Sequence, residues 1–315
     1  MMTTASETPL LTIAVCTWNR AELLRDCLDS VVAQQSISSA YEVLIIDNGS
    51  SDNTQVVCKE YVGKLPGFRS VVELKTGLSH ARNRAVAEAA GTAIAFVDDD
   101  AILCDNWLRV VEKTLLRDDY AAFGGPYDAW HRYGPPPAWF KDEWESNILD
   151  SADGPLAQGQ YPSGGNCVIS LNWCRRLGGF STKLGMEGNK IRYGEESELF
   201  ERIRSAGGTL GWANEMLVHH CVRQEKYGFF WRIKSSIARG RDYVSVVSPS
   251  FSLKRLLWRV VCAAYAFGAF CIRFLCARIT SRCHFWQTDF FDCGTAFFAA
   301  IGAVIGELCL PLRHV

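Results

Sequence analysis

The sequence predicts an α/β fold with a doubly wound, mainly parallel sheet and an apolar helical extension at its C-terminal end. Short apolar runs typical of buried strands alternate with segments of helical period through the first third of the 315 residues, as in strand–helix–strand units. Polar turns, several of them acidic, follow these runs directly. Apolar residues make up 48% of the chain and concentrate after about Phe251. We therefore expect one domain over residues 1–245 and an extension over residues 246–315.

The elements are expected in a simple order. A β-rich run at Leu10–Cys16 precedes a helix at Ala21–Gln35, whose apolar residues recur at helical spacing. Tyr41–Ile46 is the next buried strand, and the polar turn after it can cap a second helix. The later elements are a strand at Phe68–Leu74, a helix at Leu78–Ala90, strands at Ala93–Val97, Cys167–Leu171 and Met216–Val218, and a helix that begins after Gly194.

Three adjacent carboxylates, Asp98, Asp99 and Asp100, follow the strand at Ala93–Val97. Like charges repel, and a buried carboxylate needs a cation or hydrogen-bond donors. Hard oxygen ligands at a strand end suit Mg²⁺ or Mn²⁺, ions that commonly bridge protein carboxylates and substrate phosphates. An isolated Asp-Asp-Asp would more often be a solvated acidic turn, but related elements elsewhere in the chain favour the metal site.

Two further polar residues are expected at the same edge of the sheet. Thr17 and Asp47 each follow a predicted strand. In sheets of this kind, ligands bind beyond the carboxyl ends of the strands. We therefore expect these two turns and the acidic turn at Asp98–Asp100 to converge on one crevice.

The middle of the chain, from Gly124 to Tyr161, is irregular and rich in aromatic residues. Aromatic faces can pack against sugar rings, and they can equally form the core of a long loop. The glycines of Tyr161–Asn166 allow a ligand to approach the backbone or simply form a tight turn.

Acidic and imidazole groups recur further along the chain. Glu195 and Glu196 lie at the start of a predicted helix, where the helix dipole alone can account for negative charge. His219 and His220 follow a short strand, and an imidazole there can add a nitrogen ligand to a carboxylate-bound divalent ion.

With these residues in place, the chain resembles a family 2 glycosyltransferase, an enzyme of GT-A fold that uses a nucleotide-activated sugar. The resemblance spans roughly residues 11–242 and rests on the order of seven motifs. They are Val15–Arg20, Ile45–Asp52, Gly77–Asn83, Phe96–Asp100, Gly164–Asn166, Gly194–Leu199 and Val218–His220. The fold implied is a Rossmann-like mixed, mainly parallel sheet flanked by helices.

The resemblance implies a set of donor-binding residues. Thr17 and Asp47 would hold the nucleotide base, and Arg20 and Arg82 would lie near the base or the phosphates. The donor would be a UDP-, GDP- or dTDP-sugar.

The resemblance also implies a metal site for Mn²⁺ or Mg²⁺. Asp98 and Asp100 would form the family's Asp-x-Asp motif, with Asp100 as metal ligand and Asp98 toward the ribose or sugar. Asp99 can exchange roles with either neighbour. His220 corresponds to the family's late metal- or phosphate-binding histidine, with His219 in reserve.

The family's Glu-Asp motif corresponds to Glu195 and Glu196, so Glu196 would be the general base, with Glu in place of the usual Asp. Gly165 and Asn166 would lie on the acceptor side. A carboxylate that removes the acceptor's proton as the hydroxyl attacks the anomeric carbon gives a single displacement, which inverts the anomeric configuration.

Composition and charge exclude some classes of protein. The net charge of −1 gives no support for a nucleic-acid binder. The N-terminal residues lack the basic and apolar regions of a signal peptide, so we expect a cytoplasmic catalytic part. The thirteen cysteines show no Cys-x-x-Cys spacing, and we interpret them as reduced core thiols.

The C-terminal segment is basic and apolar. Between Phe251 and Thr288 there are six cations and no Asp or Glu, and the apolar stretch between Arg259 and Arg273 has 13 residues, fewer than the ~20 that span a bilayer. Interfacial helices, a tilted or re-entrant hairpin, and helices packed on the domain all fit. We favour interfacial helices on the cytoplasmic face of the membrane. Gly302–Gly306 is expected to be a small-residue packing motif.

The sequence therefore predicts an inverting, metal-dependent hexosyltransferase that acts on a lipid-linked or polysaccharide acceptor. A catalytically inactive scaffold subunit of the same fold is the main alternative. A nucleotidyltransferase is less favoured because no glycine-rich triphosphate loop is apparent.

Overall fold

The computed structural model describes residues 8–64, 67–149, 152–188, 190–247, 250–280 and 285–310. Residues 1–7, which contribute to the expectation of no signal peptide, and Arg282, one of the six C-terminal cations, lie outside this set. The chain forms two compact units. The first consists of Met1–Trp130, Glu145–Thr182 and Glu196–Cys221, and the second of His131–Trp144, Lys183–Glu195 and Val222–Val315. The expected functional division at residue 245 stays a prediction.

The first unit is built on an eight-stranded mixed sheet with the order β3-β2-β1-β4-β9-β6-β10-β8. Strands β3, β2, β1 and β4 are mutually parallel, and β9 runs antiparallel between β4 and β6. The strands are β1 Leu11–Thr17, β2 Tyr41–Asp47, β3 Phe68–Val72, β4 Ala93–Asp98, β6 Ala122–Gly124, β8 Gly154–Pro155, β9 Asn166–Ser170 and β10 Leu210–Trp212. The predicted mainly parallel α/β sheet is confirmed.

Helices cover both faces of this sheet because its strands are apolar on both sides. On β1, Ile13 and Val15 join one core cluster with α1, α2 and α4, while Ala14 joins a second cluster with α3, α5 and α6. The helices are α1 Ala21–Val32, α2 Thr54–Lys64, α3 Leu78–Glu88, α4 Trp107–Arg117, α5 Leu171–Arg176 and α6 Glu195–Ser205. The period-2 alternation of β1 thus supplies two cores from one strand.

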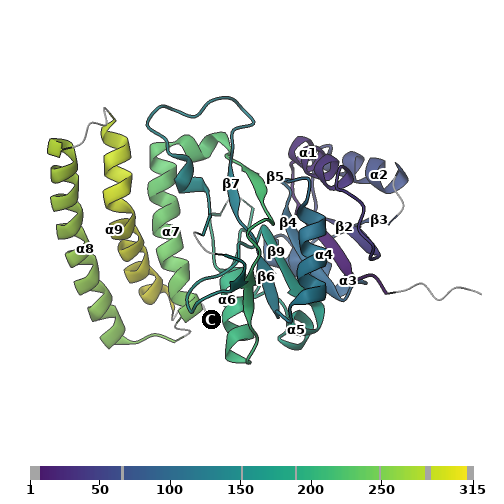
Figure 1. The fold of residues 1–315 in the computed structure, drawn as a ribbon. Helices are drawn as coiled ribbons and strands as arrows, with labels where there is room; N and C mark the ends of the chain where they lie inside the picture. Colours follow the sequence, from purple (N-terminus) through teal and green to yellow (C-terminus); the bar gives the residue numbers. More distant parts are fainter. Residues whose placement is uncertain are drawn as a thin grey trace, which may run out of the picture. The chain divides into compact units, whose positions relative to one another are not determined.

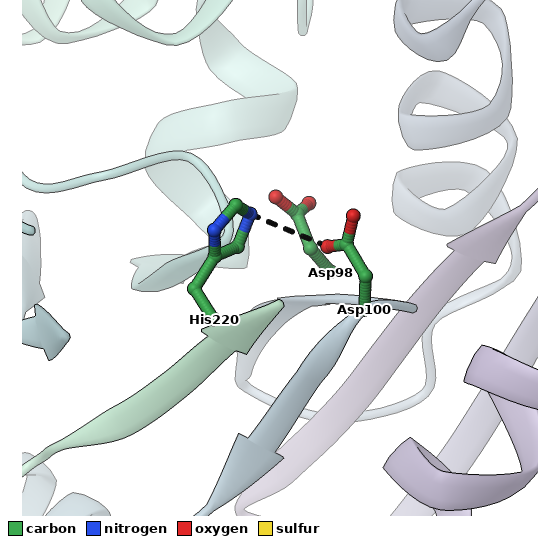
Figure 2. Close-up of side chains that lie close together, drawn as sticks. All are labelled: Asp98, Asp100 and His220. Carbon is green, nitrogen blue, oxygen red and sulfur yellow. Dashed lines mark ion pairs between the residues drawn. The ribbon is translucent and has the colours of Figure 1, made fainter. Parts of the chain in front are cut away.

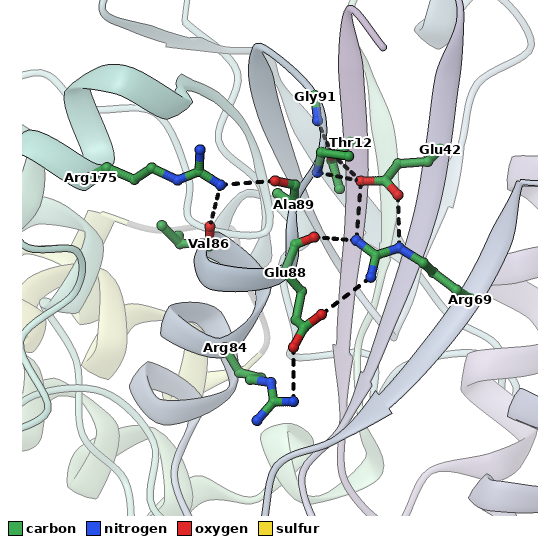
Figure 3. A network of polar contacts seen from close by, with 10 residues as sticks. Thr12, Glu42, Arg69, Arg84, Val86, Glu88, Ala89, Gly91 and Arg175 are labelled. Carbon is green, nitrogen blue, oxygen red and sulfur yellow. Dashed lines mark hydrogen bonds and ion pairs between the residues drawn. The ribbon is translucent and has the colours of Figure 1, made fainter. Parts of the chain in front are cut away.

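An arginine network fastens the C-terminal end of α3 (Figure 3). Arg69 pairs with Glu42 at 2.8 Å and donates to the main-chain carbonyl of Glu88. Arg175 donates to the carbonyls of Val86 and Ala89 at 3.1 and 2.9 Å. These guanidinium groups satisfy carbonyls that a helix end leaves without intrahelical partners, and so hold α3 against the sheet.

A second, three-stranded sheet has the order β5-β11-β7. Its strands are β5 Ala101–Leu103, β7 Tyr127–Trp130 and β11 Val218–Cys221. The sequence placed a strand at Met216–Val218 with the two histidines after it; the strand instead begins at Val218 and contains both histidines. Their side chains therefore point to opposite faces of the sheet.

The second unit contains three long helices, α7 Phe229–Val247, α8 Leu253–Thr280 and α9 Trp286–Cys309, which lie side by side with α9 in the middle (Figure 1). A Cβ on Gly240 would overlap the main chain at Ala299, and one on Gly302 would overlap it at Ile237. The expected small-residue packing motif of α9 is therefore confirmed, with α7 as its partner.

Helix α8 runs antiparallel to α9 and is held to it by two sets of ion pairs. Glu307 of α9 accepts from Arg259 at 3.0 Å and pairs with Arg255 at 3.3 Å. At the opposite end, Asp289 pairs with Arg278 at 2.9 Å. Both helices are long and apolar enough to cross a membrane, by length and composition alone. The apolar stretch of 13 residues between Arg259 and Arg273 is therefore shorter than helix α8, which has 28 residues.

Much of the aromatic segment expected at residues 124–161 belongs to the core of this second unit. Trp139 stacks on Phe291 with ring centroids 5.9 Å apart, and Arg232 lies 4.5 Å above the ring of Trp144. Phe140 is buried among the same side chains. For these rings, the loop-core interpretation is the correct one.

Candidate active site

The ends of three parallel strands lie in register at one edge of the large sheet. Thr17 of β1 pairs with Asp47 of β2, and its neighbour Cys16 pairs with Asp98 of β4. A hydrogen bond joins the turns after β1 and β2, since the side-chain carbonyl of Asn19 accepts from the backbone N–H of Ser51 at 2.7 Å. The predicted convergence of the three turns is confirmed.

The three carboxylates of the acidic turn have different surroundings. Asp99 and Asp100 are buried, whereas Asp98 is half-buried. Arg20 donates from Nη1 to Asp99 at 2.6 Å and to Asp100 at 3.2 Å. Burial raises the pKa of Asp99 to about 6; Arg20 opposes this shift and Asp100 adds to it. A resident guanidinium therefore compensates part of the negative charge of this turn.

Asp98, Asp100 and His220 point toward one another (Figure 2). Each offers one ligand atom, and the three atoms lie within 4.8 Å of one another. His220 Nε2 is 3.3 Å from Asp100 Oδ1, because β11 pairs with β5 so that His220 lies opposite Ala101. Two carboxylates and one imidazole form a donor set suited to a divalent ion such as Mn²⁺.

Buried polar atoms without partners support a ligand at this place. Among the described residues, the buried side-chain oxygens that lack a hydrogen bond are Thr17 Oγ1, Asp47 Oδ2 and Asp99 Oδ2, and His220 Nδ1 also lacks one. Such atoms are rare in folded proteins and mark a site where a ligand, ion or water completes the set. The three oxygens lie at or just after the ends of β1, β2 and β4, and His220 lies beside them on β11, so the residues present fit a metal and a polar ligand.

A glycine turn before β9 covers Asp98. A Cβ on Gly165 would overlap the Asp98 carboxylate, and one on Gly164 would lie 2.9 Å from Arg82 Nη1 and 3.2 Å from Glu196 Cγ. Arg82 is buried and donates to the carbonyl of Gly164 at 3.0 Å, with Asp98 at 3.4 Å. The turn thus brings Arg82 and Glu196 close to the acidic cluster.

Asn166 has different contacts from those expected. Its side chain is fully buried. The amide donates to the carbonyls of Pro126 and Met216 at 2.9 and 2.7 Å and accepts from the Trp107 indole at 2.9 Å. Both N–H donors and one of the two oxygen lone pairs are therefore used within the protein, which positions the β9 turn. The expected acceptor-side contact of Asn166 stays a prediction.

The remaining expected residues differ in access. Glu195 is buried, whereas Glu196 is half-buried and lies next to Gly164. His219 points away from the acidic cluster and pairs with Asp128 at 2.6 Å. Of the two histidines, His220 is therefore the one that lies with Asp98 and Asp100.

Two asparagines that the sequence did not single out shape the crevice. Asn19 has φ of 52°, a left-handed conformation that Asn tolerates better than most residues. Asn48 is buried, donates to the carbonyls of Glu73 and Lys75, and accepts from the Gly77 N–H. The signal available in the sequence was their place directly after predicted strands.

The fold is of the GT-A type. The structure is similar to that of the mannosyltransferase PcManGT from Pyrobaculum calidifontis in complex with GDP-Man and Mn²⁺, with a TM-score of 0.64, 18% identity, and coverage of 95% of this chain and 88% of that chain. It is also similar to GalNAc-T7 with UDP, GalNAc and Mn²⁺, with a TM-score of 0.59, 16% identity, and coverage of 83% of this chain and 51% of that chain.

Residues 12–162 match the model of Glycosyl transferase family 2, and the relatives and the fold support assignment of the chain to this family. It is 27% identical over 271 residues to the succinoglycan biosynthesis protein ExoM of Rhizobium meliloti, over 84% of each chain. It is 23% identical over 261 residues to the glycosyltransferase AglE of Haloferax volcanii, over 81% of this chain and 82% of that protein.

Proposed function

We propose that this protein is an inverting glycosyltransferase that moves a hexose from a nucleotide-sugar donor to a lipid-linked or polysaccharide acceptor. The observation that carries the proposal is the convergence of Asp98, Asp100 and His220 at the strand ends that also present Thr17 and Asp47. The names of ExoM, a succinoglycan biosynthesis protein, and of the nucleotide-sugar-bound structural neighbours support the substrate class.

Asp98, Asp100 and His220 would hold the divalent ion, Mn²⁺ or Mg²⁺. When bound, such an ion neutralises charge that develops on a diphosphate leaving group. The unpartnered buried atoms Thr17 Oγ1 and Asp47 Oδ2 are acceptors for the base or ribose of the nucleotide. Hydrogen bonds to these groups would replace those that the buried oxygens lack.

Arg20 and Arg82 would supply positive charge on the donor side. Arg82 is buried and anchored by Gly164, so it has a fixed position beside Asp98. Arg20 is part-exposed and held by carboxylates alone at its Nη1 atom, so it can turn toward a phosphate. A preorganised guanidinium and a mobile one would together balance the diphosphate.

Glu196 is the proposed general base. It is half-buried at the start of α6, beside the glycine turn that covers Asp98. Its carboxylate would take the proton of the acceptor hydroxyl as that oxygen attacks the anomeric carbon and the nucleoside diphosphate leaves. A single displacement of this kind inverts the anomeric centre.

The proposed acceptor is at the membrane, because α8 presents an apolar surface. Its window of highest hydropathy has no buried residue. We define the outer face of α8 as its strongly exposed apolar residues: Leu253, Leu257, Trp258, Val261, Tyr265, Ile272, Leu275 and Ile279. An aromatic and aliphatic face of this composition is typical of a helix that lies in the membrane interface.

The packing of the second unit favours an interfacial helix over a spanning one. Helix α7 runs along α9, and its middle exposes Lys234 and Arg239. If α9 crossed the hydrocarbon core, these cations would enter it too, at a cost of several kcal/mol each. A helix α8 that lies on the cytoplasmic face avoids this cost. Arg255, Arg259 and Arg278 of α8 pair with acidic residues of α9. We therefore expect the apolar face of α8 to contribute more to membrane binding than its positive charge.

A nucleotide-sugar panel tests the proposed donor. Thermal unfolding of the purified full-length protein is measured with UDP-, GDP- and dTDP-sugars, each with and without Mn²⁺. We expect one nucleotide class to raise the melting temperature only when Mn²⁺ is present. An absence of any metal-dependent shift across the panel would contradict the proposed donor site.

A further inference from the structure

A cysteine, a histidine and an aspartate form a connected chain on the small sheet, away from the acidic cluster. Cys104 Sγ lies 3.4 Å from His219 Nε2, and His219 Nδ1 lies 2.6 Å from Asp128 Oδ1. The order is thiol, imidazole and carboxylate, which is the arrangement of a nucleophile, its base and the group that orients the base. Neither the metal site nor the proposed base uses these three residues.

The surroundings of Cys104 differ from those of the core cysteines. Cys58, Cys167 and Cys174 are buried, and burial raises their pKa to about 12. Cys104 is only half-buried, and its partners His219 and Asp128 have side chains 42% and 34% exposed. This thiol is therefore less enclosed than the core thiols.

The thiol needs a base to react. Burial and the nearby carboxylates of Asp128 and Asp105 raise the pKa of Cys104, so the protonated form predominates at neutral pH. The nucleophile in disulfide exchange is the thiolate. His219 is placed to take the proton, and Asp128 fixes which ring nitrogen faces the sulfur.

The same small sheet connects Cys104 to the metal site. Strand β5 has Asp100 immediately before it and Cys104 immediately after it. On its partner β11, His219 pairs with Ile102 and His220 with Ala101. Further hydrogen bonds join Cys104 N to the Leu217 carbonyl at 3.2 Å and Cys221 N to the Asp100 carbonyl at 2.8 Å. A group added to Cys104 would lie against the His219 ring, one residue from His220 on the same strand.

We propose that Cys104 is a modification site that exchanges with low-molecular-weight disulfides, assisted by His219 and Asp128, and that the adduct weakens metal binding at Asp98, Asp100 and His220. The Cys104 sulfur attacks one sulfur of a disulfide RS–SR while its proton passes to His219. A new S–S bond forms, the old one breaks, and the leaving thiolate takes up a proton as RSH. A reduced thiol RSH reverses the step, so the site responds to the ratio of disulfide to thiol.

Adduct formation is tested on the purified full-length protein with glutathione disulfide. Peptide mass spectrometry follows the glutathione adduct at each cysteine over time. We expect modification at Cys104, and a rate there that falls ~10-fold or more in His219→Gln, with Asp128→Asn changing it in the same direction. Rates at the exposed Cys262, Cys271 and Cys276 serve as internal references and should not change. An unmodified Cys104, or a rate unaffected by His219→Gln, would overturn the proposal.

The coupling is tested separately, with Mn²⁺ alone as the probe; this part rests on the proposed metal site, whereas adduct formation does not. The thermal shift caused by Mn²⁺ is measured before and after modification, and again after reduced glutathione is added. We expect the shift to be lost on modification and restored on reduction, while Cys104→Ser keeps it throughout. A fully modified wild-type protein that keeps its shift would overturn the coupling, and a wild-type protein with no shift before modification would overturn the metal site itself.

Discussion

Asp98 and Asp100 are two residues apart, yet the backbone presents them differently. Asp98 ends β4, next to the glycine turn, and Asp100 precedes β5 and faces His220. Asp99 lies between them and pairs with Arg20. The turn thus directs Asp98 and Asp100 toward His220 and Asp99 toward Arg20, which avoids three like charges at one point.

Asp100→Ala should abolish metal-dependent donor binding and leave the fold intact, because a buried carboxylate is removed from a repulsive cluster. A ligand at a concentration 100 times its Kd adds about 2.7 kcal/mol to stability, and this increment should disappear. The measurement is the thermal shift with Mn²⁺ and UDP. Asp105→Ala, which removes an exposed acid five residues away, is the matched control. A thermal shift equal to that of the wild-type protein would show that Asp100 is not a metal ligand.

Glu196→Gln should lower turnover by ~10²-fold or more with donor affinity nearly unchanged, because a general base acts mainly in the transition state. Product formation and donor Kd are measured on the same preparation. Glu195→Gln is the matched control, since it makes the same change at the adjacent, buried position. A larger loss of turnover in Glu195→Gln would assign the general base to Glu195 instead.

At the scale of elements, the strands β1, β2 and β4 could be predicted because each is mostly apolar and long enough to stand out from its polar flanks. Strand β3 contains Arg69 and Ser70 and was expected from its flanking apolar residues and its place in the alternating order. Strands β6 and β10 have three residues each, too few for a period to appear. Helix α4 was not assigned, although Trp107, Leu108 and Val111 lie at helical spacing. The strand-end residues of the site followed from the strands themselves.

Other parts of the site could not be read from the chain, because they depend on partners distant in sequence. Asn166 is buried by Trp107, Pro126 and Met216, and nothing near it in sequence indicates this. The pairing of Arg20 with Asp99 joins residues 79 positions apart. Such contacts exist only once the sheet has formed.

Gly302→Ala should destabilise the protein by about 1–3 kcal/mol, because the new methyl would overlap the α7 main chain and force the helices apart. Gly268→Ala on α8 is the matched control, since nothing lies within 4 Å of its Cβ position. Alanine there should stabilise by roughly 0.5–1 kcal/mol through helix propensity. Denaturant unfolding measures both, and equal effects of the two substitutions would contradict the close α7–α9 packing.

At the scale of the whole molecule, membrane binding should depend on the outer face of α8. Val261→Asp should weaken binding to anionic liposomes about tenfold or more, because burial of a Val side chain contributes ~1.5 kcal/mol. Flotation measures the bound fraction. Leu116→Asp is the matched control, an exposed apolar side chain on a helix of the first unit. Equal binding of Val261→Asp and wild type would assign α8 to a protein contact instead.

The guanidinium of Arg20 would make metal binding at the proposed site an exchange of one cation for another. The ion pair between Arg20 and Asp100, at 3.2 Å, would compete with an incoming ion. The free energy needed to displace Arg20 would then lower the observed affinity for the ion. A nucleoside diphosphate offers the displaced guanidinium a new anionic partner. Each ligand should therefore increase the affinity for the other by the same factor. Metal and donor would bind cooperatively, and each alone would bind weakly.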